Sequence, residues 1–278
     1  IKPYMPKSHE IQGDILIVKL EHQLEKFGSV IAKAMLEQFP SVRLVCADKG
    51  VTGEFRVREL TALQSRDGDN STQTRIRENG IMIWTDPAKA YFSARLSNER
   101  SGNLSTALKL KKQLGRPLKI CDPYAGVGPS LAALLGEPEL VSDCFAGDLN
   151  PDAFTLLKLN TTHFLAKSKG VNVVLNNQDA RHWNQGNAAG EIDFLMVNLP
   201  HDSISHLPKL LPLLARKQIT VIRGWAIVDK GDIKEQQNKV EEILNSAGAS
   251  IQSITCQEIK GFSSSKVFMC FETWQSFL

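Results

Sequence analysis

The stretch LKICDPYAGVGP, residues 118–129, decides the fold. It begins as a short apolar strand, Leu118–Asp122, and turns through a glycine loop into a helix predicted over Ser130–Leu135. Gly126 and Gly128 allow a tight turn and a close approach to a ligand, because glycine has no side chain. The spacing lacks the full GxGxxG pattern of dinucleotide enzymes. A strand, glycine turn and helix in this order nevertheless indicate a nucleotide site in an α/β domain.

The same rhythm of strand and helix continues downstream. The predicted strands are Cys144–Leu149, Val171–Leu175, Ile192–Val197, Ile219–Val228, Ile251–Gln257 and Lys266–Glu272, and the predicted helices are Pro151–Ala166 and Asp232–Ala247. Alternating strands and helices predict a doubly wound, mostly parallel α/β sheet, here of seven strands. The last two strands have no helix between them, which predicts an antiparallel edge.

Upstream, residues 1–90 are expected to form a separate small α+β domain, before a second domain at 91–278. We predict strands at Ile11–Leu20 and Val42–Ala47, a helix at Glu25–Phe39, and a β-pair of Glu54–Leu63 with Thr74–Trp84 around the polar loop Ser65–Ser71. Residues 1–117 hold 19 Lys and Arg against 13 Asp and Glu, whereas the remainder holds 14 against 17. This asymmetry favours a polyanion-contacting surface on the N-terminal side, with ordinary charge variation as the alternative.

Composition excludes several classes of protein. Hydrophobic residues make up 42% of the 278 residues, which supports a substantial core. No apolar run approaches the roughly 20 residues that cross a bilayer, so we expect no membrane partner. The cysteines Cys46, Cys121, Cys144, Cys256 and Cys270 are scattered without zinc-ligand spacing, which predicts reduced thiols in a cytoplasmic protein and no metal.

Acidic residues follow three successive strands, where open α/β sheets bind ligands. Asp122 could accept hydrogen bonds from the ammonium of a methionine moiety, and Asp148, twenty residues after Gly128, could bind both ribose hydroxyls. Asp179 could bind an adenine amino group. Each also has an interpretation that involves no ligand: a structural turn, a carboxylate at a helix N-terminus and a solvated turn, respectively. Their occurrence in order favours the ligand site.

The fourth strand ends in Asn198-Leu199-Pro200-His201, which resembles the NPPY-type loop of nitrogen-methylating enzymes. An Asn side chain and a backbone fixed by proline can orient a planar amide or amine. We therefore expect nitrogen, rather than carbon or oxygen, to be the methyl acceptor.

Together these segments resemble one family, the archaeal and eukaryotic tRNA guanine-37 N1-methyltransferases, over about Ile11 to Glu272. The resemblance rests on GDI at 13–15, GEFRVRE at 53–59, YFSARLSNER at 91–100, AGVGP at 125–129, DLNP at 148–151, DAR at 179–181 and NLP at 198–200. Ala94 and the segment Asp122-Pro123-Tyr124 depart from the usual family residues. The resemblance implies a class I, Rossmann-like methyltransferase domain preceded by a small domain that helps to bind the tRNA anticodon stem-loop.

The resemblance also implies roles for individual residues. Glu99 would remove the proton from guanine N1, with an Arg95 ion pair on a helix surface as the structural alternative. Arg58, or else Arg56, would stabilise negative charge on guanine O6. Asn198 and Pro200 would hold the base. S-adenosylmethionine would contact Asp122, Tyr124, Ala125, Gly126, Gly128, Asp148, Leu149, Asn150, Asp179, Ala180 and Asn198. RNA would contact Arg56, Arg58, Arg95 and Arg100, together with Arg75, Arg77 and Lys112.

Three alternatives remain. A wybutosine-pathway aminocarboxypropyl transferase uses the same cofactor, but Asn198–Pro200 argues against it. Another nucleic-acid or protein nitrogen methyltransferase would share the glycine loop and the Asn-x-Pro loop but not the RVRE segment. The joint presence of Asp122, Asp148, Asn198 and Glu99 argues against an inactive RNA-binding homologue. We expect a monomer, and family members often carry a further N-terminal domain that this chain begins too late to contain.

Overall fold

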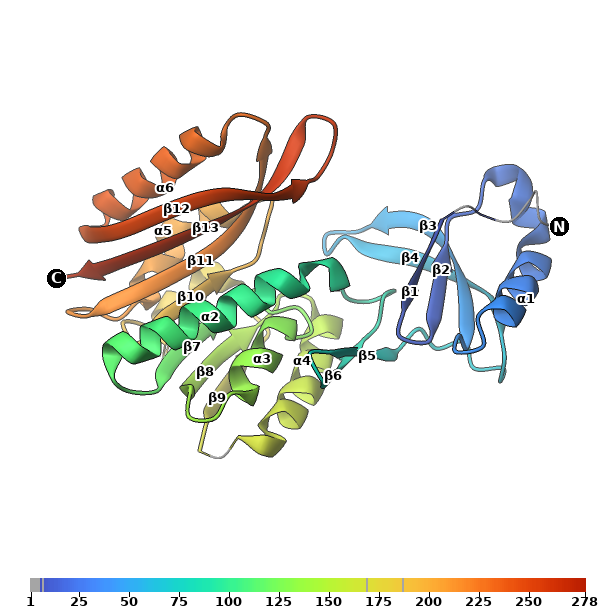
Figure 1. The fold of residues 1–278 in the computed structure, drawn as a ribbon, viewed down its shortest axis with the longest axis horizontal. Coiled ribbons are helices and arrows are strands. Elements are labelled where there is room, and N and C mark those ends of the chain that lie inside the picture. Colours follow the sequence, from blue (N-terminus) through green and yellow to red (C-terminus); the bar gives the residue numbers. More distant parts are fainter. Residues whose placement is uncertain (1–5, 7, 169, 187) are drawn as a thin grey trace. The chain divides into compact units, whose positions relative to one another are not determined.

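The chain folds as two compact units. The computed structural model describes residues 6, 8–168, 170–186 and 188–278, which divide into the two units after Ser97 (Figure 1). The division falls after Ser97 rather than after residue 90, because the family segment that begins at Tyr91 passes through a short 3-10 turn, Ala94–Leu96, before the first helix of the second unit. Each unit has its own sheet and is described separately.

The N-terminal unit is built on a four-stranded sheet with one helix on it. The sheet has the order β1-β2-β3-β4, formed by β1 (His9–Gln12), β2 (Ile15–Val18), β3 (Leu44–Thr52) and β4 (Val57–Ser65). β2 and β3 are parallel, and the connection between them contains a 3-10 turn, His22–Phe27, and α1 (Gly28–Gln38). Side chains of β2 alternate between a cluster with α1 and a second cluster on the other face, so this strand is buried on both sides.

Two expectations about this unit were wrong. The predicted strand Ile11–Leu20 is two antiparallel strands that turn at Gly13, whose φ of 61° lies in the left-handed region. The predicted pair of residues 54–63 with 74–84 does not form either. β4 pairs with β3, and residues 74–85 form their own hairpin, β5 (Thr74–Glu78) with β6 (Ile81–Thr85). The hairpin turns at Asn79-Gly80, both with positive φ, the dipeptide favoured in tight β-turns.

The C-terminal unit confirms the predicted α/β fold. Its seven-stranded sheet has the order β12-β13-β11-β10-β7-β8-β9. The strands are β7 (Leu118–Asp122), β8 (Val141–Gly147), β9 (Asn172–Asn176), β10 (Phe194–Val197), β11 (Ile219–Asp229), β12 (Ala249–Gly261) and β13 (Lys266–Phe277). The five strands β7 to β11 are parallel, and β13 is antiparallel to both β11 and β12, as the missing helix between the last two strands predicts.

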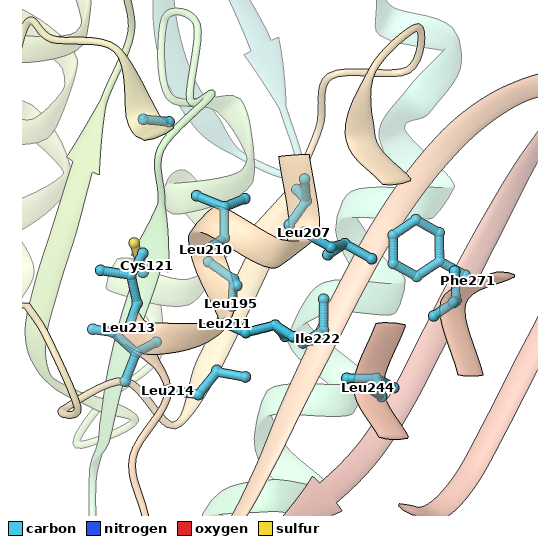
Figure 2. Packing of buried hydrophobic residues seen from close by; sticks show 14 of the residues in the cluster. Cys121, Leu195, Leu207, Leu210, Leu211, Leu213, Leu214, Ile222, Leu244 and Phe271 are labelled. Atoms are coloured by element: carbon cyan, nitrogen blue, oxygen red, sulfur yellow. The ribbon is translucent and has the colours of Figure 1, made fainter. Parts of the chain in front are cut away.

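Helices cover this sheet. They are α2 (Ser97–Leu114), α3 (Pro129–Gly136), α4 (Pro151–Phe164), α5 (Ser203–Leu210) and α6 (Ile233–Ser246), with short 3-10 turns at Leu165–Lys167, Ala180–Gln185 and Leu211–Leu213. Figure 2 shows leucines of the 207–214 segment packed with Ile222 of β11 and Phe271 of β13. Since successive strand residues point to opposite faces, Arg223 and Trp225 point away from this cluster, and both contact Glu99 of α2.

Candidate functional site

The glycine loop joins the ends of two neighbouring strands. It follows β7, and the Ala125 N–H donates to the Gly147 carbonyl at the end of β8 over 2.8 Å. The Gly126 N–H donates to Oδ2 of Asp148 over 2.9 Å. Gly128 has a φ of 85°, and a Cβ there would lie 2.7 Å from Leu157 of α4. Glycine at this position therefore lets the loop turn tightly into α3 against α4.

Asp122, at the end of β7, is a buried carboxylate, and none of the described cations forms an ion pair with it. It is 2% exposed, and its one hydrogen bond among the described residues is a long one, 3.4 Å, from the Tyr124 N–H. Burial raises its pKa to about 7, assisted by repulsion from Asp148 and opposed by the Tyr124 N–H. A buried carboxylate is stabilised by a positive partner, and a ligand ammonium would supply one.

Asp148 follows β8 and lies beside the same loop. Its two oxygens accept N–H bonds from Gly126 and Asn150, each 2.9 Å long. Burial raises the pKa of this carboxyl, while the two N–H bonds favour its charged form. Each carboxylate oxygen can accept a further hydrogen bond, as two ribose hydroxyls would require. The next residue, Leu149, is 46% exposed and offers an apolar surface at this position.

Three other predicted cofactor residues are already engaged in the fold. Asn150 is buried and caps α4, where its Oδ1 accepts the N–H groups of Asp152 and Ala153. Asp179 caps the turn Ala180–Gln185 and pairs with Arg181, which lowers the pKa of its carboxyl to about 2. Ala180 is 3% exposed. Asn150 and Ala180 thus support the site from the interior.

Tyr124 connects the glycine loop to α5. Its hydroxyl lies 2.7 Å from Nδ1 of His206. Burial raises the pKa of Tyr124 and lowers that of His206, so both groups are held in their neutral forms. This contact fixes the Tyr124 side chain. The next residue, Ala125, anchors the loop through its N–H.

The Asn198-Leu199-Pro200 loop follows β10 directly, and it is held from both sides. Pro200 accepts a backbone hydrogen bond of 2.8 Å from Ile227 of β11. The Ser203 hydroxyl oxygen lies 2.7 Å from the Leu199 carbonyl oxygen and 2.5 Å from that of Trp225, so its single proton can be donated to either. Asn198 is half-buried and lies at the carboxyl end of β10, which pairs with β7. The loop and Asp122 therefore share one edge of the sheet.

Glu99 lies in the first turn of α2. It is largely buried, and is not an exposed residue on the helix surface. Its side chain is 12% exposed, and its Oε2 accepts hydrogen bonds from Arg223 Nη2 at 3.2 Å and Trp225 Nε1 at 3.0 Å. The predicted alternative, an ion pair with Arg95 on the helix surface, is wrong because Glu99 points toward the sheet. The sequence does contain a signal for this partner: Arg223 interrupts an apolar strand, and a buried arginine requires a counter-charge.

The predicted RNA-contacting arginines differ in exposure. Arg58 pairs with Glu10 at 2.6 Å within the N-terminal unit, and Arg56 is exposed in a turn with a φ of 51°. Arg95 is exposed. Arg100 is 5% exposed, so it is poorly placed to contact phosphate and we remove it from the RNA-contacting set. Arg56 and Arg58 belong to one unit and Glu99 to the other.

Other features bear on the class of protein. Within the described ranges, no group of three or more His, Cys, Asp or Glu side chains could hold a metal ion. No helix in the same ranges is long and apolar enough to cross a membrane. All five cysteines are free, and four are buried. A cavity of about 700 Å³ lies beside Asp179 and Trp183, and a groove of about 780 Å³ runs from Pro200 between α5 and α6.

Comparisons with known proteins agree with this geometry. Residues 2–68 match a family profile described as the TYW2 N-terminal domain, and residues 74–252 match the TRM5/TYW2 methyltransferase domain. The chain is 29% identical over 269 residues to tRNA (guanine(37)-N(1))-methyltransferase Trm5b of Pyrococcus abyssi, covering 95% of this chain and 73% of the relative. A Trm5b from Methanocaldococcus jannaschii is 34% identical over 154 residues, covering 55% of this chain and 42% of that relative.

Solved structures place the fold in the same group. The crystal structure of Pyrococcus abyssi Trm5b superposes with a TM-score of 0.76 at 26% identity, covering 99% of this chain and 77% of that one. A complex of aTrm5 with tRNALeu gives 0.72 at 25% identity and covers 99% and 73%. Pyrococcus horikoshii TYW2 gives 0.79 at 18% identity, covering 99% and 92%, which is a likeness of fold.

These findings confirm the predicted fold and enzyme class, and a methyltransferase profile agrees with the predicted cofactor, S-adenosylmethionine. The methyltransferase profile alone covers more than half of the chain, including the glycine loop, Asp148, Asp179 and the Asn198–Pro200 loop. The chain belongs to the TRM5/TYW2 methyltransferase family.

Proposed function

We propose that this chain methylates N1 of guanine 37 in tRNA. The observation that carries the proposal is the edge formed by β8, β7 and β10, which are neighbours in the sheet. Asp148, Asp122 and Asn198 stand at the ends of these strands. The named relatives that match the chain are guanine-37 N1-methyltransferases, and one similar structure is a complex with tRNA. Free thiols support a cytoplasmic location, and we propose a monomer.

The residues at this edge fit S-adenosylmethionine by the chemistry of their side chains. The bound cofactor would supply a methyl group activated by its sulfonium. Asp122 would bind the ammonium and thereby gain the positive partner that its burial calls for. Asp148 would accept hydrogen bonds from the ribose, and Leu149 would pack on the adenine. Asp179, despite its bond to Arg181, retains lone pairs for the adenine amino group.

Glu99 would remove the N1 proton as the methyl group arrives. Guanine N1 carries a proton at neutral pH, so a carboxylate held close to it would provide general-base catalysis. Asn198 and the rigid Pro200 would hold the edge of the base. Arg58 of the N-terminal unit, or else Arg56, would stabilise charge on guanine O6, as the family resemblance implies.

A second candidate is aminocarboxypropyl transfer from the same cofactor to a tRNA nucleoside. One observation favours it: the N-terminal residues match a profile named for TYW2. The Asn198–Pro200 loop favours methyl transfer. Incubating the protein with tRNA and S-adenosylmethionine, followed by mass spectrometry of the nucleosides, separates the two reactions. A 1-methylguanosine product supports our proposal, and an aminocarboxypropyl nucleoside contradicts it.

Replacing Glu99 by Gln tests the chemical role. Gln keeps the size of the side chain but is not a base, so single-turnover methyl transfer should fall by about two orders of magnitude or more, with cofactor and tRNA binding nearly unchanged. Higher pH should partly restore the rate, because hydroxide then helps to deprotonate N1.

A matched control is Glu235→Gln, which alters an exposed carboxylate that pairs with Lys239 on α6. This control should transfer methyl at the wild-type rate. Wild-type transfer by Glu99→Gln would remove Glu99 from the chemistry, while the cofactor assignment would stand on Asp122 and Asp148.

A further inference from the structure

Arg223 is a buried arginine in a central strand, which is costly unless its charge is balanced. Its side chain is 7% exposed and lies between two carboxylates, with Nη2 3.2 Å from Glu99 and Nε 3.4 Å from Glu272. Nη1 donates to the backbone carbonyl of Glu99 over 2.7 Å and to Oδ1 of Asn103 over 2.8 Å. The guanidinium thus binds both ends of Glu99, its main chain and its carboxylate.

Trp225, two residues further along β11, donates from Nε1 to the same carboxylate oxygen of Glu99 at 3.0 Å. The ring is 3% exposed, so it cannot turn away without disturbing its neighbours. Two donors on one strand therefore converge on Oε2 of a residue on α2. Cys270 of β13 also lies against Glu99, and burial raises the pKa of this thiol to about 12, which keeps it neutral.

The first turns of α2 leave room for this arrangement. A Cβ at Gly102 would collide with Nη1 of Arg223, so only glycine allows the guanidinium to lie this close to the helix. The second carboxylate, Glu272, is held by other donors: Thr106 Oγ1 at 2.7 Å and Trp274 Nε1 at 2.8 Å. Glu99 and Glu272 consequently have separate sets of hydrogen bonds, and Arg223 lies between them.

The register of the sheet places the contact between Trp225 and Glu99 beside the carboxyl end of β10. Gly224 of β11 pairs with Val197, the last residue of β10. Trp225 is therefore level with Asn198, the first residue of the loop proposed to hold the base. The Trp225 carbonyl oxygen also lies 2.5 Å from the Ser203 hydroxyl, which contacts Leu199. Trp225 therefore contacts Glu99, the proposed general base. It also contacts Ser203, which supports the loop proposed to hold the guanine.

We propose that Arg223 and Trp225 are positioning residues that hold the Glu99 carboxylate in the orientation required for proton removal. The inference rests on the proposed function of Glu99. A free glutamate samples many rotamers, and few of them place an oxygen within reach of a proton on the substrate. Fixing Oε2 with two donors, and the backbone with a third, restricts Glu99 before the substrate arrives, which favours proton transfer by orientation rather than by new chemistry.

Trp225→Phe tests the proposal with little change in packing, because it removes the donor and retains an aromatic ring. Trp274→Phe is the matched control: it makes the same change on the neighbouring strand, but its lost hydrogen bond goes to Glu272. We expect Trp225→Phe to lower kcat by about tenfold, the effect of losing one hydrogen bond to a charged group. KM for tRNA and the affinity for S-adenosylmethionine should stay unchanged. Trp274→Phe should leave kcat unchanged.

The same substitution in a Glu99→Gln background separates positioning from general structural damage. If Trp225 acts through Glu99, the double variant should be no slower than Glu99→Gln alone. An unchanged kcat for Trp225→Phe, an equal loss for Trp274→Phe, or a further tenfold loss in the double variant would each overturn the proposal. Arg223→Lys, which retains the charge without the planar fork, should recover part of the kcat lost in Arg223→Met.

The outcomes also distinguish this inference from the proposed function. If Glu99→Gln is as active as wild type, the base assignment itself fails, whatever Trp225→Phe does. If Glu99→Gln is inactive and Trp225→Phe is fully active, only the positioning role fails. Thermal unfolding of each variant identifies any that lose activity because they no longer fold.

Discussion

At the scale of single residues, the charge of Asp122 determines how cofactor binding should depend on pH. Its pKa is raised to about 7 by burial, so in the free protein the carboxylate is charged above this pH and protonated below it. Binding of a ligand ammonium requires the charged form. The affinity for S-adenosylmethionine should therefore be highest above pH 7 and fall as the pH drops, because binding must then displace a proton.

This prediction can be measured by calorimetry. Between pH 8 and pH 6 we expect the cofactor affinity of the wild-type protein to fall by about tenfold. Asp122→Asn should bind more weakly at pH 8 and should lack this part of the pH dependence. Whatever dependence remains in the variant belongs to other groups, including the ligand itself. An identical pH profile in both proteins would show that Asp122 does not titrate with binding.

The structure brings some of the predicted site residues to one edge of the sheet and buries others in the fold, for a physical reason. Asp122, Asp148 and Asn198 stand at the carboxyl ends of apolar strands that the sequence alone locates, and parallel strands bring these ends to one edge. Asn150 and Arg100 were assigned to ligands, yet both are buried. The capping role of Asn150 is a local signal, since an Asn before Pro151 is typical of a helix N-terminus. The burial of Arg100 depends on how α2 packs, which local sequence does not encode. Arg223 was overlooked although a charge within an apolar strand signals a buried partner.

At the scale of secondary structure, the end of β8 depends on a close approach between strands. Gly147 pairs with Asn176 of β9, and a Cβ at Gly147 would collide with the backbone oxygen of Asn176 and with the Trp183 ring. A backbone atom cannot move aside as a flexible side chain can, so the strands would have to separate. Gly147 precedes Asp148, and this strain would reach the proposed ribose site.

Gly147→Ala should destabilise the C-terminal unit by about 2 kcal/mol or more, the usual cost of inserting a methyl group into a tightly packed site. Urea unfolding followed by tryptophan fluorescence would measure it, because Trp183, Trp225 and Trp274 all lie in this unit. Gly261→Ala is the control, since nothing lies within 4 Å of a Cβ at that position. Equal stability of the two variants would mean that β8 and β9 have more freedom than their spacing indicates.

Secondary structure was most predictable where one strand gives one continuous apolar run. Leu118–Asp122 was placed correctly, and the helix after the glycine loop was placed within one residue at each end. In the N-terminal unit, Ile11–Leu20 has the same apolar character but folds back at Gly13-Asp14, a dipeptide that is itself a hairpin signal. The Asn79-Gly80 turn was a readable hairpin signal inside a segment that was taken as one strand. Which strands pair with one another was harder to predict, because the partners are far apart in sequence.

At the scale of the whole molecule, basic residues are in excess in the first part of the chain, where residues 1–117 hold 19 Lys and Arg against 13 Asp and Glu. The excess of basic residues falls before residue 118, and exposed cations there include Arg56, Arg75, Arg77, Arg95 and Lys112. Arg75 and Arg77 are two residues apart on β5 and therefore point to the same face of the hairpin. The Arg75 guanidinium lies 5.6 Å from the centre of the Trp84 ring, which holds it on that face.

We therefore predict that tRNA binding weakens steeply with salt and that β5 contributes to the dependence. Each phosphate neutralised by Lys or Arg releases counterions, so the plot of log affinity against log salt has a slope of about −0.7 to −0.9 per contact. Replacing both Arg75 and Arg77 by Gln should weaken binding at low salt and make this slope less steep by about 1.4 to 1.8. Lys209→Gln, on an exposed lysine of α5, is the control and should leave the slope unchanged. Filter binding of tRNA between 50 and 300 mM salt measures all three proteins. A flat salt dependence in the wild type would contradict phosphate binding, whereas a steep slope that survives loss of both arginines would move the RNA surface away from β5.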